Sequence, residues 1–295
     1  MPFLFANKLG RVKSLKYQVK YIIGEAKYVI RDWQRVITEQ DKLAEIVNQK
    51  EIRVVGLRRS GNHAVINWIN KQESGYVSHL NNIVPKCNPY RLLYRHYPKE
   101  RLREESWGYF RPKDCLIYSY EDYCLKQITA RQFENKHDLY LGKSKIRYDV
   151  LILRDPFNLL ASRIKSNMLP VKNKYLSLSE LWINYAKEFL QETNYLQNNK
   201  VCINYNRWVS DKNYRHQIAD SLQLNFTDAG FDEVRGYGGG SSFDGRDFHG
   251  LASNMDVNNR WKNITDHPKY HQFLANEQLM SYSQKIFGDF EEITK

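Results

Sequence analysis

Residues 52–69 combine an apolar strand, a short basic turn with one glycine, and a helix, in that order. At the start of a helix, the free backbone N–H groups and the positive end of the helix dipole both attract an anion. The pattern therefore predicts an α/β fold that holds a phosphate-like group in this turn. The turn side chains that can add hydrogen-bond donors are Arg58, Arg59, Ser60, Asn62 and His63.

This turn differs from the loop that binds ATP and magnesium in nucleoside triphosphatases. That loop, G-x-x-x-x-G-K-[ST], has a lysine and a hydroxyl residue directly after its second glycine. Here Asn62 and His63 follow Gly61. The sequence therefore favours an anionic ligand other than ATP with magnesium.

A second strand and helix follow one another at residues 148–167. The apolar strand 148–153 ends at Arg154, and Pro156 suits the first turn of the next helix. Arg154 and Ser162 are eight residues apart, so both can face the crevice at the carboxyl ends of the strands, where open α/β sheets bind ligands. An arginine and a hydroxyl converging there suit a second phosphate.

Together these motifs resemble those of the sulfotransferases that use 3′-phosphoadenosine 5′-phosphosulfate (PAPS). The family binds the 5′-phosphosulfate with a [KR]-S-G-[ST] turn, which residues 59–62 match except that Asn62 replaces the hydroxyl residue. It binds the 3′-phosphate with an arginine and a serine eight residues later, as at Arg154 and Ser162. The resemblance implies a P-loop-like three-layer α/β fold with a central parallel sheet, PAPS as cofactor, and adenosine 3′,5′-bisphosphate as product.

Two further segments resemble the same family. Residues 260–263, Arg-Trp-Lys-Asn, are similar to a segment before its last helix, which implies that Arg260, Trp261 and Lys262 help to close the nucleotide site. Residues 201–206 are similar to a strand whose following tyrosine, here Tyr205, lies near the adenine. The resemblance spans residue 50 to the end of the chain, and the chain departs from it at Asn62, at His63 and in lacking an R-K-G triplet before Trp261.

Sulfuryl transfer needs a general base for the acceptor and positive charge for the leaving phosphate. In the family the base is a histidine or glutamate, often just after a central strand. Glu121 leaves the carboxyl end of the predicted strand 115–120 and is the first choice, and His79, at the end of strand 75–79, is the second. Glu121 can instead be a solvated carboxylate or the partner of an arginine. Arg59 is predicted to neutralise the leaving phosphate, and no metal is expected.

From residue 52 the chain alternates strands and helices, which is typical of a parallel sheet. Residues 84–113 are predicted to form an irregular insertion over the mouth of the site, and the glycine-rich residues 236–245 either a mobile lid or a surface linker. The predicted strands are 52–57, 75–79, 115–120, 148–153 and 200–205. The predicted helices are 62–72, 157–167, 178–198, 211–223 and 270–287.

Residues 1–48 are predicted to be a helical extension of a catalytic domain at 49–295. Apolar residues recur every seven positions along residues 12–37 in an amphipathic pattern that can break near Gly24, and the opposite side is rich in lysine and arginine. Three interpretations are open: the helix packs on the catalytic domain, it lies on a membrane surface, or it self-associates as a coiled coil. The residues of the stripe are Val12, Leu15, Val19, Ile22, Ile23, Ala26, Val29, Ile30, Trp33, Val36 and Ile37.

The composition of the chain bears on its ligands, its location and its cysteines. The net charge of +12 fits an anionic cofactor and a basic surface, and no nucleic-acid-binding motif is present. No run of 18 apolar residues occurs, and the apolar residues 1–5 are too short for a signal peptide, so a cytoplasmic location is expected, with peripheral membrane contact as an option. The four scattered cysteines are expected to be buried free thiols.

The acceptor is not fixed by these motifs. A saccharide is the first choice, and a tyrosine-bearing peptide, a lipid and a small alcohol stay open. The alternatives to a sulfotransferase are an inactive member of the fold that binds an anionic partner or membrane, and a kinase-like nucleotide enzyme.

Overall fold

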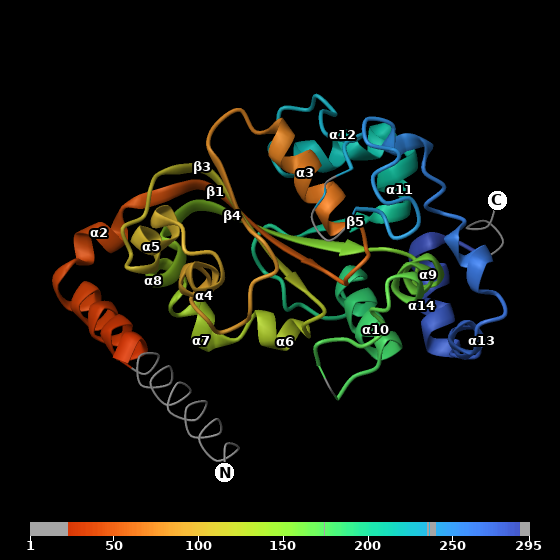
Figure 1. Ribbon diagram of the computed structural model, residues 1–295, viewed down its shortest axis with the longest axis horizontal. Helices are drawn as coiled ribbons and strands as arrows, with labels where there is room; N and C mark the ends of the chain where they lie inside the picture. Colours follow the sequence, from red (N-terminus) through yellow and green to blue (C-terminus); the bar gives the residue numbers. More distant parts are fainter. Residues whose placement is uncertain (1–22, 174, 235, 237–239, 290–295) are drawn as a thin grey trace, which may run out of the picture.

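A five-stranded parallel sheet forms the centre of the computed structural model, which describes residues 23–173, 175–234, 236 and 240–289 (Figure 1). The strand order is β2-β3-β1-β4-β5, and every neighbouring pair is parallel. This confirms the predicted α/β fold with a central parallel sheet. The strands are β1 (Ile46–Gly56), β2 (Val77–Leu80), β3 (Lys113–Glu121), β4 (Lys143–Leu153) and β5 (Val201–Asn204).

Helices cover both faces of the sheet and make three layers. Alternate residues of β1 enter two separate cores: Ile52 and Val54 pack on one face, Val55 and the following Leu57 on the other. The first face is covered by α3 (Asn62–Gln72), α11 (Tyr205–Ser210) and α12 (Lys212–Ser221). The second face is covered mainly by α6 (Leu125–Ile128), α7 (Arg131–Glu134), α8 (His137–Leu141), α9 (Pro156–Lys165), α10 (Leu178–Phe189), α13 (Pro268–Leu274) and α14 (Glu277–Phe287).

The order of the strands positions the site. After β1 the chain adds β2 and β3 on one side, and then β4 and β5 on the other. The point where the direction of strand addition reverses is where open parallel sheets leave a crevice for ligands, beyond the carboxyl ends of the strands. The basic turn that follows β1 lies at this point.

Two predicted helices differ substantially from the structure, whereas the other three agree with it within two residues at each end. The helix expected at 178–198 ends at Phe189, because the buried carboxylate of Glu188 accepts hydrogen bonds from the backbone of Tyr195 and Leu196 and turns the chain back. The helix expected at 270–287 is split into α13 and α14. The side chain of Asn276 caps the start of α14 by accepting a hydrogen bond from the Leu279 N–H, at 3.0 Å.

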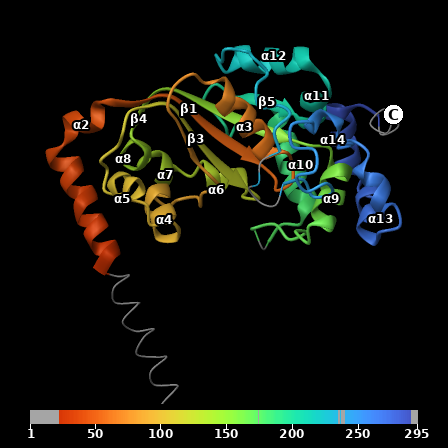
Figure 2. The ribbon, with the colours of Figure 1, turned by 45° about the horizontal axis from the view of Figure 1, so that its top comes forward.

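The prediction of an irregular insertion at 84–113 was wrong. This segment contains α4 (Pro89–His96) and α5 (Glu100–Ser106). The side chain of Asn88 caps α4, and Pro89 occupies the first helical position, where its missing N–H costs nothing. The segment packs against the N-terminal helix, at the end of the sheet where β1 begins, and therefore does not cover the carboxyl-end crevice (Figures 1 and 2).

The described part of the N-terminal extension is helical over residues 23–38 and is followed by α2 (Gln40–Ala44). Gly24 is helical, and the helix has no break from residue 23 to residue 38; the residues before 23 lie outside the described part of the chain. Val12, Leu15, Val19 and Ile22 of the predicted stripe lie outside the described residues, and the domain boundary at 48 and 49 stays a prediction. None of the helices in the described residues is both long and apolar enough to cross a membrane.

A buried charge network supports the start of the sheet and predicts a pH effect. The Glu51 carboxylate accepts hydrogen bonds from Tyr118 Oη (2.9 Å) and Arg147 Nε (3.1 Å), and His137 Nε2 lies 2.8 Å from it. Burial alone lowers the pKa of His137, but the charge of Glu51 and hydrogen bonds to Asp138 and Glu51 raise it to about 9, from 6.5.

Because the folded-state pKa is raised, His137 stabilises the fold fully below about pH 6.5, and this contribution is lost as the pH rises through 9. Urea denaturation should show a loss of up to about 3 kcal/mol of unfolding free energy from this group between these pH values. The His137→Gln variant should lack it. His216→Gln, which changes a mostly exposed histidine, should keep the wild-type pH profile, and an unchanged profile in His137→Gln would contradict the assignment.

Candidate active site

The turn between β1 and α3 has the backbone of an anion-binding loop. Gly61 is the residue before the first turn of α3 and has φ 87°, and Arg59 has φ 71°. Gly56 and Gly61 are five residues apart, which is the spacing of the two glycines in G-x-x-x-x-G. The prediction from the sequence considered Gly61 alone and did not use this spacing. The α3 dipole and its first N–H groups therefore point toward the crevice.

Gly61 also leaves room for an aromatic ring. A Cβ atom placed on Gly61 would lie 2.0 Å from the ring of Tyr205. Only glycine fits this close approach, and glycine also adopts the left-handed φ without strain.

Gly61→Ala is therefore expected to lower the unfolding free energy by about 2–4 kcal/mol, the sum of backbone strain and overpacking. Gly24→Ala is the matched control, because nothing lies within 4 Å of a Cβ there and the position is helical. In urea denaturation, the unfolding free energy of the control variant should rise by about 0.5–1 kcal/mol. Equal effects of the two substitutions would show that the Tyr205 contact does not constrain the turn.

A buried ion pair holds the base of this turn. Asp122, just after β3, accepts a hydrogen bond from the Arg58 N–H (2.9 Å) and a two-pronged pair from Arg163 of α9 (2.8 and 3.1 Å). The side chains of Asp122 and Arg163 are fully buried. Neither residue stands out in the sequence, because the chain pattern does not show which distant residue each one meets.

Asn62 connects the turn to the predicted base. Its Nδ2 atom donates to Glu121 Oε1 and to the Leu57 carbonyl, both at 3.0 Å. Glu121 is 8% exposed and lines the cavity described below. The Asn62 amide thus fixes the carboxylate at the end of β3, and a serine or threonine, with a single O–H, could not donate to both acceptors at once.

The second motif forms a buried arginine cluster. Arg154 donates from Nη1 to Ser162 Oγ (3.0 Å) and to the carbonyl of Arg59 (3.2 Å), and from Nη2 to the Val257 carbonyl. Arg260 donates to Ser241 Oγ (2.8 Å) and Asp244 Oδ2 (3.0 Å), with Nη1 3.5 Å from Ser162 Oγ. The two strand–helix motifs therefore meet, as their positions in the sequence predict.

This cluster concentrates positive charge. Burial, and next the charge of Arg260, lower the pKa of Arg154 to about 10, and the same two causes lower the pKa of Arg59. The Nε atoms of Arg154 and Arg260 and the hydroxyl of Ser60 are buried without a hydrogen-bond partner in the described part of the chain. An anion bound here would relieve the repulsion among the arginines and offer acceptors to unsatisfied donors.

A cavity of about 440 Å³ brings most of the predicted residues together. Ser60 and Ser162 are fully buried behind its wall, Ser162 against Arg154. The predicted site residues that line the cavity are Arg58, Arg59, Gly61, Asn62, His63, Glu121, Arg154, Tyr205 and Arg260.

Besides Ser60 and Ser162, three more predicted residues lie outside the lining of this cavity. His79 is on β2, where Ser78 and Leu80 are the buried neighbours. Trp261 donates its backbone N–H to Asn158 and stacks on Tyr270, with ring centroids 6.4 Å apart, so it packs against α9 and α13. Lys262 is exposed.

An aromatic wall and a glycine-rich edge complete the cavity. Tyr205 starts α11 and stacks on Trp208, with ring centroids 5.7 Å apart and an angle of 16°. The described residues of the glycine-rich segment contact the arginines: Arg59 Nη2 lies 2.7 Å from Ser242 Oγ and 3.2 Å from the Gly240 carbonyl. This segment therefore borders the site, although residues 237–239 lie outside the described residues. Sequence patterns did not identify Trp208, Ser241 or Ser242.

His267 lies at the start of α13, outside the cavity lining. His267 Nδ1 accepts a hydrogen bond from the Lys269 N–H and caps α13. Over residues 23–173, 175–234, 236 and 240–289, no three His, Cys, Asp or Glu side chains are grouped as metal ligands would be. The four cysteines are free thiols, but Cys87 is exposed, so the prediction of buried thiols was wrong for this residue.

Comparisons with known proteins give no family model and no curated protein that matches the chain. Among solved structures, the chain is similar to mouse sulfotransferase SULT7A1 complexed with PAP: TM-score 0.47, 12% identity, covering 83% of this chain and 88% of that one. It is also similar to the sulfotransferase domain of the Synechococcus olefin synthase, with TM-score 0.46 and 13% identity over 83% of this chain and 96% of that one.

Proposed function

We propose that this protein is a sulfotransferase that uses PAPS as donor and an acceptor hydroxyl or amine. The observation that carries the proposal is the convergence of three arginines, Arg59, Arg154 and Arg260, on one cavity at the carboxyl ends of the strands. They belong to two separate strand–helix motifs and to the C-terminal segment. A ligand with two separate phosphate-like groups could bind Arg59 with one group and Arg154 and Arg260 with the other.

The residues present fit the donor. The turn at 58–63 and the start of α3 would hold the phosphosulfate, and Arg154, Ser162 and Arg260 the 3′-phosphate. The face of Tyr205 would lie beside the adenine. The unpartnered Arg154 Nε and Arg260 Nε belong to side chains that line the cavity and are donors that such a ligand would satisfy, and the cavity volume is in the range of small-molecule sites.

Bound PAPS supplies a sulfuryl group activated by its bond to a phosphate. Glu121 accepts the proton of the acceptor hydroxyl or amine, and Asn62 holds the carboxylate in place for this transfer. Arg59 and the backbone N–H groups of the turn stabilise the negative charge that develops at the leaving phosphate. Asp122 and Arg163 position the turn without reaching the cavity.

The test is transfer of labelled sulfate from PAPS into glycan, lipid and peptide fractions. We expect labelling of one fraction by the wild-type protein, and background labelling by Glu121→Gln. The glycan fraction is our first choice for the acceptor. Labelling of one fraction by the wild type and Glu121→Gln alike would contradict the role of Glu121, and phosphate transfer from ATP would contradict the proposed reaction.

A further inference from the structure

The helix at 23–38 packs on the protein with its polar side. Asp32 pairs with Arg91 of α4 (2.8 Å), Tyr28 Oη lies 3.1 Å from Ser106 Oγ, and Arg35 Nη1 donates to the Leu139 carbonyl (2.8 Å). Glu25 pairs with Arg95. This arrangement reverses the usual one, in which an amphipathic helix buries its apolar stripe.

The apolar stripe is consequently exposed. Ile30 and Trp33 are 67% and 65% exposed, and the spacing of the stripe places its residues along one side of the helix. Contiguous apolar patches of this kind mark interaction surfaces. The exposed residues of this stripe are Ile23, Val29, Ile30, Trp33, Val36 and Ile37.

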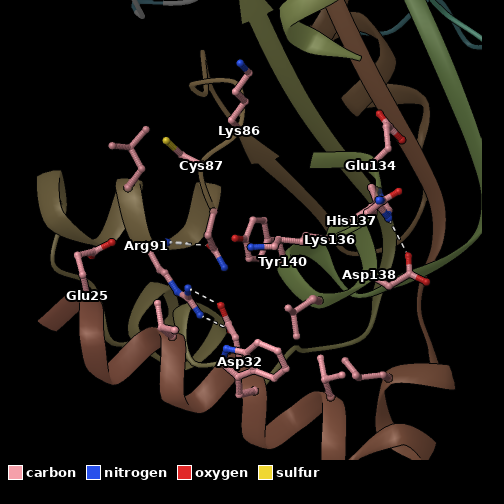
Figure 3. Close-up of a pocket in the computed structure, with 18 of the residues that line it drawn as sticks. Glu25, Asp32, Lys86, Cys87, Arg91, Glu134, Lys136, His137, Asp138 and Tyr140 are labelled. Atoms are coloured by element: carbon pink, nitrogen blue, oxygen red, sulfur yellow. Dashed lines mark hydrogen bonds and ion pairs between the residues drawn. The ribbon is translucent and has the colours of Figure 1, made fainter. Parts of the chain in front are cut away.

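A groove of about 860 Å³ runs beside the stripe, between the helix, α4 and α8 (Figure 3). Val29, Trp33 and Val36 line it from the helix, and Lys86 and Lys136 line it from the protein body. Both lysines are exposed, as is Lys27 on the helix itself. Four carboxylates line the groove too, but each is paired with a basic side chain, namely Glu25 with Arg95, Asp32 with Arg91, Glu134 with Arg53 and Asp138 with His137.

The charges of the chain favour an anionic partner over a second copy. Residues 1–24 include Lys8, Arg11, Lys13, Lys16 and Lys20 and no acidic residue, so their like charges oppose the close approach of a second copy. The acids of residues 25–39 could offset this charge only if they were free to pair with it. Those acids are already paired: Glu25 with Arg95, Asp32 with Arg91, and Glu39 with Arg31.

We propose that the exposed stripe at residues 23–37 docks on an anionic phospholipid membrane. The helix lies between the protein and the bilayer, with its polar side on α4 and α5 and its apolar side in the lipid interface. The lysines that border the stripe contact lipid phosphates. The proposal is independent of the sulfotransferase reaction, because no residue of the stripe lines the active-site cavity.

Vesicle co-sedimentation of the full chain tests this surface. We expect binding to phosphatidylcholine vesicles that contain about one-third phosphatidylserine, at least about tenfold weaker binding to pure phosphatidylcholine, and weakening as salt rises from about 0.1 to 0.5 M. The double variant Ile30→Asp with Ile37→Asp should bind at least about tenfold more weakly than the wild type. Trp33→Glu should behave similarly.

Tyr195→Glu is the matched control, because it also replaces an exposed apolar side chain by an acid but lies away from the helix. It should bind like the wild type, and all variants should keep the wild-type thermal midpoint, since the changed side chains are exposed. Equal binding by the double variant, or equal binding to neutral and anionic vesicles, would overturn the proposal. So would a wild-type dimer in analytical ultracentrifugation that the double variant dissociates, because the stripe would then be a subunit interface.

Discussion

The Glu121→Gln variant is expected to lose about 10²–10⁴-fold in kcat while it binds adenosine 3′,5′-bisphosphate as the wild type does. Glutamine keeps the size of the side chain and an oxygen that can accept the hydrogen bond from Asn62 Nδ2, so the wall of the cavity should be preserved. It cannot accept the proton of the acceptor. Single-turnover sulfate transfer and calorimetric nucleotide binding separate these two effects.

Glu233→Gln is the discriminating companion, because Glu233 is the other glutamate that lines the cavity. It pairs with Lys71 at 3.2 Å and accepts a hydrogen bond from Asn67. We expect this variant to retain most of its turnover. A loss of turnover in Glu233→Gln with wild-type turnover in Glu121→Gln would move the base to Glu233.

The second large effect is expected for Arg154→Lys. The lysine keeps the charge but cannot donate at once to Ser162, the Arg59 carbonyl and a bound phosphate, as the arginine fork can. The Kd for adenosine 3′,5′-bisphosphate should rise by about 100-fold, the scale of one or two charged hydrogen bonds. The Kd for adenosine 5′-phosphate, which lacks the 3′-phosphate, should change by less than about fivefold.

Arg207→Lys serves as control, because the Arg207 side chain is 57% exposed and lies outside the cavity lining. It should leave both dissociation constants unchanged. A similar loss of affinity for both nucleotides in Arg154→Lys, with an unchanged thermal midpoint, would show that this arginine does not distinguish the 3′-phosphate.

Local patterns in the sequence predicted the framework of the site. The strands before Arg58 and Arg154 are buried and β-branched, and the residues at the ends of parallel strands share one edge of the sheet. For this reason Arg59 and Arg154 could be assigned to one crevice before any distance was known. Glu121 and Tyr205 were assigned to it through the resemblance to the sulfotransferases. Their roles toward a nucleotide stay predictions.

Long-range partners could not be predicted in the same way. The pair between Asp122 and Arg163, and the contact of Arg59 with Ser242, join residues that are 41 and 183 positions apart. Such contacts depend on how the folded chain brings distant residues together. The periodicity of apolar residues in the sequence does not contain this information. The Asn88 cap with Pro89, by contrast, was a readable helix signal within the segment predicted to be irregular.

The N-terminal helix shows a different limit of sequence reasoning. The apolar stripe was correctly identified over the described residues 23–37, but a hydrophobic pattern does not say what the stripe contacts. Ion pairs with Arg91 and Arg95 attach the opposite side of the helix to the protein. Both arginines belong to α4, a helix that was not predicted from the sequence. Because α4 was not predicted in the segment 84–113, the orientation of the N-terminal helix could not be predicted either.

The most direct test of the central claim is calorimetric titration of the wild-type protein with three nucleotides. We predict that adenosine 3′,5′-bisphosphate binds with a micromolar or lower Kd, without magnesium, and that adenosine 5′-phosphate binds at least about 100-fold more weakly. This difference would reflect the arginine cluster at Arg154 and Arg260. Binding of ATP with magnesium, together with no detectable binding of adenosine 3′,5′-bisphosphate, would contradict the account.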